Sequence, residues 1–208
     1  MTRIPLGDLR VALSNPAKYA KSFQPGEGGG GPSKYGMLLF AIGEFHKTND
    51  PKKAQDYLET RITKNFRNVN DLAKYALWLQ VYVREFRALG NNFVNVRDNI
   101  AIPLPARFGG LTVSGQAARI DLDPSGGYAV WVFVRGAPDW KDDPRMPLLQ
   151  LAYSQKLGVG LDDVSVGTFD FVAGKHACVR YSRIRVNKVQ RALWKLLFLI
   201  QRKQNRSI

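Results

Sequence analysis

The residues best suited to chemistry are positive charges that crowd the C-terminal end of the chain. No Asp or Glu follows Asp170, whereas Lys and Arg recur throughout the remaining residues. The candidates for binding are Arg183, Arg185, Lys188, Arg191, Lys195, Arg202 and Lys203. The first two would share one face of a strand, and four of the others recur at helical spacing. Such a surface favours phosphate groups and predicts salt-sensitive, largely sequence-independent binding to nucleic acid, either DNA or RNA.

The charge of the whole chain points to the same kind of partner. The 208 residues include 31 Lys and Arg against 17 Asp and Glu, a formal net charge of +14. A cationic helix face often only keeps a protein soluble, but the missing counter-charges here favour a polyanion. A second basic group lies in the N-terminal half at Arg61, Lys64, Arg67, Lys74, Arg84 and Arg87. Residues that could stack on unpaired bases, although aromatic residues more often belong to a core, are Tyr19, Tyr35, Trp140 and Tyr181.

Other kinds of site have few candidate residues. The single cysteine, Cys178, excludes a disulfide framework, a four-cysteine zinc site and an iron–sulfur cluster held by this chain alone. We expect Cys178 to be a small buried apolar residue. His46 and His176 stand apart from any second ligand in the sequence, so we expect both to be structural or exposed. The sequence therefore predicts no metal site and no cofactor.

The hydropathy of the chain gives no sign of a membrane segment. Residues 1–10 carry charges too frequently for a signal peptide, and no apolar run approaches the roughly 20 residues of a membrane helix. The longest candidate, residues 193–200, contains Lys195. We expect a soluble, cytoplasmic protein that makes no membrane contact.

The N-terminal part of the chain has the pattern of helices. A short helix over residues 6–20 should break at Asn15-Pro16, because proline restricts the residue before it. Residues 24–33 are so rich in glycine that they predict a mobile surface loop. Apolar residues at helical spacing then predict helices over 34–46, 51–66 and 70–90, the last ending at Gly90.

After Gly90 the apolar residues alternate, which is typical of strands. Strands over 93–104, 111–121 and 128–134 form a predicted antiparallel meander, with a hairpin turn at 124–127. The third is apolar on both faces, as a central strand requires. A helix over 144–157, strands over 163–171 and 176–184, and a final helix over 187–204 complete the pattern. We expect one α/β domain over 1–208, with a helical part (1–90) and a sheet core (91–208).

Four segments in this order resemble the RecB-type branch of the PD-(D/E)XK nuclease superfamily, which includes CRISPR-associated RecB-like exonucleases. Residues 4–9 with 15–19 resemble the N-terminal segment of that family, and residues 36–40 are similar to its G-x-x-x-H. Residues 118–123 are similar to its G-R-[IV]-D, and residues 130–136 fall where it has I-I-D-Y-K-T-G. The resemblance implies a restriction-endonuclease-like core, a mixed sheet with an antiparallel meander flanked by helices.

The resemblance also implies a catalytic site that this sequence lacks. Enzymes of the family hold Mg²⁺ or Mn²⁺ with carboxylates and a histidine, and a lysine orients or activates the attacking water. Val132 and Val134 stand at the aspartate and lysine positions, and Phe40 stands at the histidine position. Asp121 is the one retained catalytic candidate. We expect the three apolar side chains to pack together in a degenerate site and Asp121 to need a partner such as Arg119.

Catalytic residues could instead have moved to neighbouring elements. The candidates are Asp139, Lys141, Asp142, Asp143, Lys156 and Asp170. Ordinary roles explain them better: residues 140–144 form a loop and helix start, Lys156 is a solvated cation in a last helical turn, and Asp170 is a charge at a strand edge. Gln150 and Tyr153 resemble the family's DNA-positioning Q-x-x-x-Y, but the spacing differs by one residue.

The sequence therefore predicts a nucleic-acid-binding, catalytically inactive subunit with a nuclease-like fold. Its setting would be a larger protein or ribonucleoprotein complex that processes DNA or RNA, such as antiviral or CRISPR-type defence or a mobile element. The alternative is an active nuclease with a relocated site, which would need Mg²⁺ or Mn²⁺. A third possibility is a protein-interaction module, which would show no salt-dependent affinity for oligonucleotides.

Overall fold

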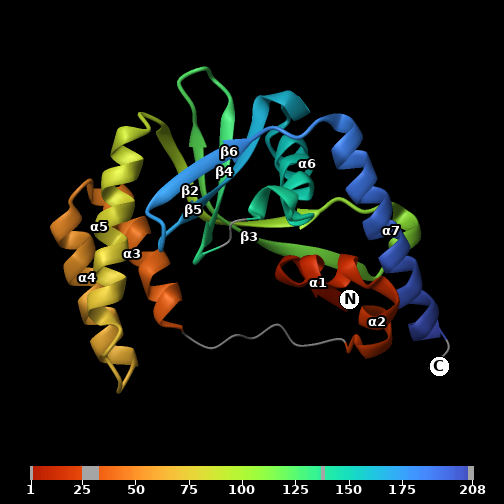
Figure 1. Cartoon of the computed structure of the whole chain (residues 1–208), viewed down its shortest axis with the longest axis horizontal. Helices are drawn as coiled ribbons and strands as arrows, with labels where there is room; N and C mark the ends of the chain where they lie inside the picture. The colour runs from red at the N-terminus through yellow and green to blue at the C-terminus, as the bar shows by residue number, and fades with distance from the viewer. Residues whose placement is uncertain (1, 25–32, 137–138, 206–208) are drawn as a thin grey trace.

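The computed structural model describes residues 2–24, 33–136 and 139–205. Its centre is a six-stranded mixed sheet of order β1-β3-β4-β5-β6, in which β2 also pairs with β3 (Figure 1). The first strand, β1 (Thr2–Pro5), runs parallel to β3 (Leu111–Leu122). No strand was expected at β1, because four residues are too few to show a period. The fold is thus α/β, as the sequence predicts.

The predicted N-terminal helices are present. They are α1 (Leu9–Ser14), α2 (Pro16–Ser22), α3 (Lys34–Thr48), α4 (Pro51–Asn65) and α5 (Leu72–Ala88). The break between α1 and α2 is at Asn15, whose side chain caps α2 by accepting from the Lys18 amide, with Pro16 at the first helical position. Gly90 follows α5 at a positive φ of 66°, as expected for a residue that ends a helix. The glycine-rich loop predicted at 24–33 lies almost wholly outside the described residues.

The predicted antiparallel meander is β2 (Asn92–Ile102), β3 and β4 (Tyr128–Val134). The Asp123 carboxylate shapes the hairpin before β4 by accepting the amides of Ser125 and Gly127. A crossover through α6 (Arg145–Leu157) then leads to β5 (Val164–Asp170), which runs parallel to β4. The central strand β4 is covered on both faces, by α6 on one and by α3, α4 and α5 on the other, as its apolar sequence predicts.

The last strand and last helix correct the predicted boundary. Strand β6 (Lys175–Val179) ends early, and α7 (Arg183–Asn205) begins four residues before the expected start. The Val186 amide already donates to the Ser182 carbonyl, and the Ser182 hydroxyl accepts the Arg185 amide at 3.4 Å. Arg183 and Arg185 thus lie in the first turn of a helix and not on one face of a strand. The stretch around Arg183 and Arg185 is too short for its alternating pattern to distinguish a strand, with a period of two residues, from a helix, with a period of 3.6.

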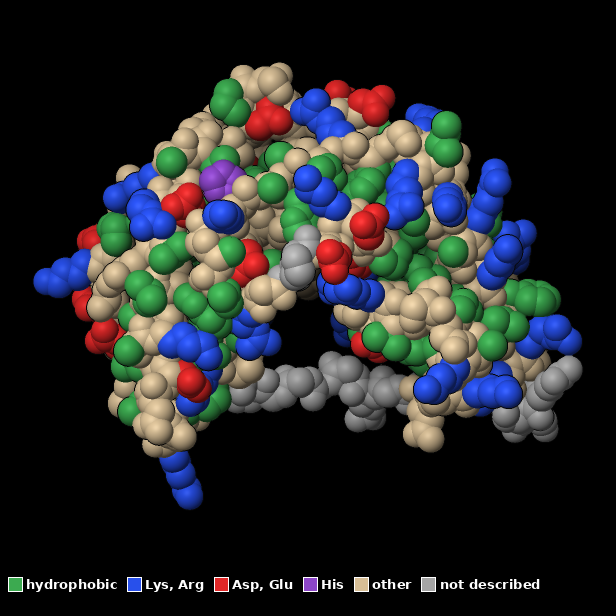
Figure 2. Space-filling view, viewed as in Figure 1, with side chains coloured by type: hydrophobic (Ala, Val, Ile, Leu, Met, Phe, Trp, Pro, Cys, Tyr) green, Lys and Arg blue, Asp and Glu red, His purple; other side chains and the backbone are tan. Residues whose placement is uncertain are grey.

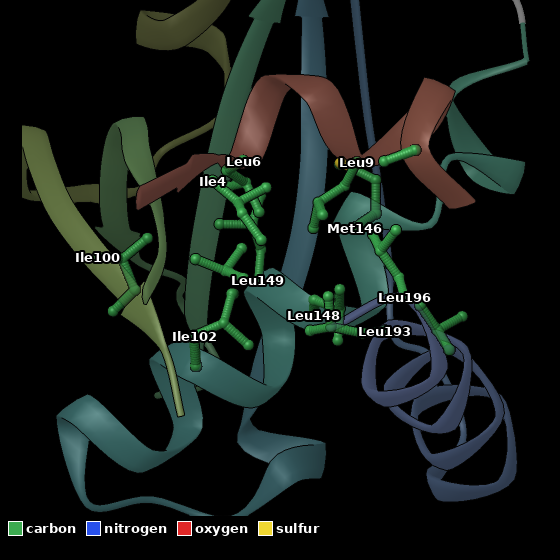
Figure 3. Packing of buried hydrophobic residues seen from close by; sticks show 14 of the residues in the cluster. Ile4, Leu6, Leu9, Ile100, Ile102, Met146, Leu148, Leu149, Leu193 and Leu196 are labelled. Carbon is green, nitrogen blue, oxygen red and sulfur yellow. The ribbon is translucent and has the colours of Figure 1, made fainter. Parts of the chain in front are cut away.

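Two clusters of buried side chains cover opposite faces of the sheet. One contains Val130 of β4 and residues of β1, α1, β2, α6 and α7. Figure 3 shows this cluster, with Leu193 and Leu196 of α7 beside Leu148 of α6. The other contains Trp131 of β4 and residues of α3, α4 and α5. Helices α3, α4 and α5 therefore stand on one side of the molecule, and α1, α2 and α7 on the other (Figure 1).

Strand β6 lies at the end of the sheet, and this position corrects the expectation for Cys178. Its thiol-bearing side chain is exposed. The sequence suggested burial because the residue is small and apolar, but an edge strand has solvent beside it. Among the helices of the described ranges, none combines the length and apolar character needed to cross a membrane.

Candidate functional site

Asp121 lies on β3, and hydrogen-bond donors surround its carboxylate. Its side chain is 0% exposed, and the side chain of Arg119, two residues away, is 2% exposed. Arg119 Nε donates to Asp121 Oδ1 in a buried ion pair. Trp131 Nε1 donates to Oδ2 at 2.9 Å, and Asn91 Nδ2 approaches the same oxygen at 3.5 Å. A buried carboxylate needs a partner, and for Asp121 this partner is Arg119, as predicted.

The far side of the Arg119 guanidinium meets aromatic and polar groups of α3 and α5. Arg119 Nη1 donates to the Tyr82 hydroxyl at 2.6 Å and to His46 Nε2 at 3.0 Å. The Tyr82 oxygen and His46 Nε2 are 2.5 Å apart. The Arg119 Cζ lies 4.0 Å from the centre of the Phe86 ring, and the His46 ring stacks on Phe93 at 4.2 Å. A planar cation is thus held between a carboxylate and a set of rings.

The burial of this cluster changes its acid–base behaviour. Desolvation, followed by the charge of Arg119, lowers the pKa of His46 to about 3. His46 is therefore neutral at ordinary pH, so Nε2 can accept a hydrogen bond from Arg119. Burial also raises the pKa of the Asp121 carboxyl, while Arg119 and the donors from Asn91 and Trp131 act in the opposite direction.

The register of the sheet separates Asp121 from the two valines at the family's catalytic positions. Asp121 pairs with Ala129, and Arg119 pairs with Trp131, so these side chains share one face. Val132 packs against the cluster on the opposite face, with Val130. Because side chains alternate along a strand, Val134 also points away from the Asp121 face. The expectation that these valines adjoin Asp121 is wrong.

Phe40 does not join the valines either. It lies on α3, a helix of the opposite face, and is 43% exposed. The guanidinium of Arg97 covers its ring at 3.8 Å from the ring centre. The predicted packing of Phe40, Val132 and Val134 in one spot is therefore wrong. The centre around Asp121 is filled by a protein cation and aromatic rings instead of aliphatic side chains.

This centre does not suit a divalent metal ion. Both oxygens of Asp121 already accept hydrogen bonds, from Arg119 and Trp131. A hard cation needs several oxygen ligands, and here a guanidinium is the counter-charge. Among residues 2–24, 33–136 and 139–205, no three His, Cys, Asp or Glu side chains lie where they could jointly hold a metal. The arrangement at Asp121 is an ion pair in which both carboxylate oxygens already have donors.

Three of the relocation candidates, Asp139, Asp142 and Asp143, line a shared groove. Asp139 and Asp142 face Arg10 of α1 and Arg185 and Lys188 of α7 across a volume of about 370 Å³. Asp142 Oδ1 lies 3.5 Å from Arg185 Nη2. The carboxylate of Asp142 therefore meets a cation, which competes with a metal for it.

Asp143 and the remaining relocation candidates have structural partners. Asp143 is buried, pairs with Arg145 at 2.5 Å and accepts the Arg145 amide at the start of α6, the role predicted for it. Asp170 accepts the amides of Gly136 and Val172 at the end of β5. Lys156 donates to Asp98 Oδ2 at 2.5 Å and to the Asn99 carbonyl, so it ties α6 to β2 and is not simply solvated.

The other side chains considered near the lost site are also structural. Lys141 Nζ lies over the Trp140 ring, and the Lys141 carbonyl accepts from the Tyr181 hydroxyl. Gln150 Nε2 donates to the Leu161 and Tyr181 carbonyls. Tyr153 donates to Asp98 at 2.9 Å. These contacts join α6 to β2 and to the segment before α7, so they hold the scaffold together.

The predicted basic stripe is present on α7. Lys188, Arg191, Lys195 and Arg202 are exposed, on the side of the helix opposite the buried Leu193. Figure 2 shows Lys and Arg side chains gathered along the side of the molecule that α7 forms. Arg183 and Arg185 extend this set at the start of the helix. We call the four exposed residues the α7 stripe.

Lys203 stands apart from the α7 stripe. Its ammonium donates to the Lys21 carbonyl at 2.8 Å and to the Phe23 carbonyl at 2.9 Å. These carbonyls lie at the end of α2, where a helix has unpaired acceptors. Lys203 therefore joins α7 to α2, a structural contact that its place in a run of cations did not reveal.

The four aromatic residues that could stack on bases, Tyr19, Tyr35, Trp140 and Tyr181, are partly buried and pack against the core, the role the sequence favours for them. Tyr19 and Tyr35 are partly buried, and their hydroxyls donate to Asp8 and to the Phe133 carbonyl. Sequence reasoning missed Trp194 and Phe198, which border the α7 stripe. The Arg107 Cζ lies 5.2 Å from the Trp194 ring centre, and Phe198 is 53% exposed. The sequence signal that could have identified them is their spacing of four residues, which places both rings on one face of the helix near Lys195 and Arg202.

Comparisons with known proteins do not assign a family. No family model matches the sequence. No curated protein matches it either. Among solved structures, one described as "Crystal structure of SSO0001" is 10% identical in sequence and covers 91% of this chain and 84% of that chain, with a TM-score of 0.34. A likeness at this TM-score carries no argument about fold or function.

Proposed function

We propose that this protein binds nucleic acid through the α7 stripe and has a restriction-endonuclease-like core that no longer cleaves. It would serve as a subunit of a larger complex that processes DNA or RNA, including defence complexes. The observation that carries this proposal is the α7 stripe itself: four exposed cations on one side of a long helix, in a stretch with no side-chain carboxylate after Asp170. Such an arrangement matches the regularly spaced charges of a phosphate backbone.

The sheet supports the nuclease-like part of the proposal. An antiparallel meander of β2, β3 and β4 leads through the crossover helix α6 to the parallel strand β5. This is the kind of mixed sheet that the sequence resemblance implies. The retained Asp121 lies on β3 in its centre, where its carboxylate pairs with Arg119 and accepts from Trp131. An Asp121 whose two oxygens are both engaged supports binding without cleavage.

A test compares the α7 stripe with cations elsewhere on the surface. Replacing Lys188, Arg191 and Lys195 by Gln should weaken oligonucleotide binding in fluorescence anisotropy. It should also reduce the slope of log K against log salt by about two, because each phosphate contact contributes roughly 0.7–0.9. The matched control replaces Lys47, Lys52 and Lys53 by Gln, which are exposed on α3 and α4. Equal effects of the two triple variants would contradict the proposal.

The groove lined by Asp139 and Asp142 favours a second candidate, a nuclease with a relocated site. The three carboxylates that line it, including Asp143, stand beside the cations Arg185 and Lys188, which could bind a substrate phosphate. An assay with labelled DNA and RNA in Mg²⁺ or Mn²⁺ decides between the candidates. Cleavage by the purified protein that is lost in Asp139→Asn or Asp142→Asn would establish the second candidate and refute the inactive core.

A further inference from the structure

Two aromatic side chains border the α7 stripe, each beside an arginine. Trp194 and Phe198 are four residues apart on α7, a spacing that makes them neighbours on one helix face. The Arg107 Cζ lies 5.2 Å from the Trp194 ring centre, and the Arg202 Cζ lies 5.8 Å from the Phe198 ring centre. We call Arg107, Trp194, Phe198 and Arg202 the aromatic patch.

The aromatic patch is assembled from two distant parts of the chain. Arg107 belongs to the 3-10 turn η2 (Ala106–Phe108), just before β3. Gln201 of α7 donates to the Arg107 carbonyl at 3.2 Å, and the buried Phe108 anchors the turn in the core. The fold therefore places the backbone of Arg107 beside α7, from where its side chain reaches Trp194.

The exposure of Phe198 has no explanation in the packing of α7. The helix buries Leu193, Leu197 and Ile200 on its inner side, whereas Phe198 is 53% exposed. Binding to a phosphate backbone requires cations alone, so it does not account for an exposed ring among them. An unpaired base does account for it, because every base has a π face that stacks on an aromatic ring or on a guanidinium plane.

The cations around Phe198 suit the same ligand. Lys195 and Arg202 lie three and four residues from Phe198, on either side along the helix. A strand with a base on Phe198 would have its flanking phosphates near these two side chains. In a duplex, the bases are stacked on one another and do not offer a free face at the backbone.

We infer that the aromatic patch takes unpaired bases, so that the ligand of α7 is a single-stranded nucleic acid. This inference rests on the proposed function, whose α7 stripe supplies the phosphate contacts. Stacking tolerates any base, so the binding should depend little on sequence and should occur with DNA or RNA strands.

The first test compares the affinity for single strands with the affinity for the corresponding duplexes. The second removes the aromatic ring of Phe198. Oligodeoxythymidine and oligouridine should bind more tightly than the same strands paired with their complements. Phe198→Leu should weaken single-strand binding by about tenfold, because a stacked base contributes roughly 1–3 kcal/mol. The salt slope should not change in this variant, because no cation is lost.

Phe40→Leu is the matched control, because Phe40 is also an exposed ring, 43% exposed, on α3. Binding by this control should equal that of the unaltered protein. Equal or tighter binding of the duplexes would overturn the inference, and so would equal effects of Phe198→Leu and Phe40→Leu. If neither strands nor duplexes bind in a salt-dependent way, the proposed function itself fails. Thermal melting of each variant checks that it is folded.

Discussion

At the scale of single residues, the centre of the molecule depends on one buried ion pair. Arg119 balances the buried charge of Asp121. The same guanidinium orders Tyr82 and His46 through hydrogen bonds and contacts the Phe86 ring. A buried pair of this kind is costly to form, but it is much more costly to break on one side only.

Arg119→Met should therefore destabilise the fold by about 3–5 kcal/mol, because it leaves a charged carboxylate buried without a counter-ion. Adding Asp121→Asn should recover part of that loss, since the amide oxygen can still accept from Trp131 Nε1 without a charge. Urea unfolding of both variants measures the two free energies. A double variant no more stable than Arg119→Met would show that the pairing of charges is not what stabilises the centre.

His46 should make the stability depend on pH. Its pKa is lowered to about 3 in the folded protein, below its ordinary value of about 6.5, so below pH 6.5 the unfolded chain binds a proton that the folded chain does not. The contribution is present above pH 6.5 and is lost as pH falls toward 3, by about 1–2 kcal/mol at pH 5.

The matched variant for this prediction is His46→Gln, which retains an acceptor but does not titrate. Urea unfolding at several pH values should show that the variant loses less stability than the unaltered protein between pH 6.5 and pH 4. Parallel curves over that range would assign the pH dependence to other groups.

The sequence could identify Arg119 as the partner of Asp121 because the two lie two residues apart on a strand. It could not place Val132 or Val134, since the face on which a side chain lies depends on the pairing of β4 with β3. Phe40 was misplaced for a related reason. The apolar pattern of residues 34–46 predicts a helix that contains Phe40. It does not predict the contact with Arg97, which belongs to β2, far along the chain.

At the scale of elements, helix α7 has two sides with different tasks. Its inner side joins the core beside α6 and α2, and its outer side carries the α7 stripe. The sequence predicted both sides because a long helix shows its period clearly. It did not predict where β6 ends and α7 begins, because the Ser182 cap acts through a few residues only.

Lys203 allows a structural contact to be separated from a phosphate contact on this helix. Lys203→Met should remove the hydrogen bonds to the Lys21 and Phe23 carbonyls and destabilise the protein by about 1 kcal/mol. That loss corresponds to a fall of about 2–4 °C in the melting temperature of a chain of this size. Oligonucleotide affinity and its salt slope should change little. If Lys203→Met weakened oligonucleotide binding as much as Lys195→Met does, Lys203 would itself be a phosphate contact.

At the scale of the whole molecule, the same excess of charge should have opposite effects on folding and on binding. A net charge of +14 repels itself in the folded state, and salt screens that repulsion. The melting temperature of the free protein should therefore rise with salt. Salt should weaken the bound state, because association with a polyanion releases counterions.

An oligonucleotide should thus raise the melting temperature strongly at low salt and hardly at all at high salt. Bound ligand stabilises a protein by RT ln(1 + [L]/Kd), so a hundredfold excess over Kd contributes about 2.7 kcal/mol, and the gain shrinks as Kd rises. Melting curves with and without oligonucleotide across a salt series should converge toward high salt. Curves that remain a constant distance apart would mean that the contact is not between the α7 stripe and phosphates, since only charge pairing at the surface is screened in this way.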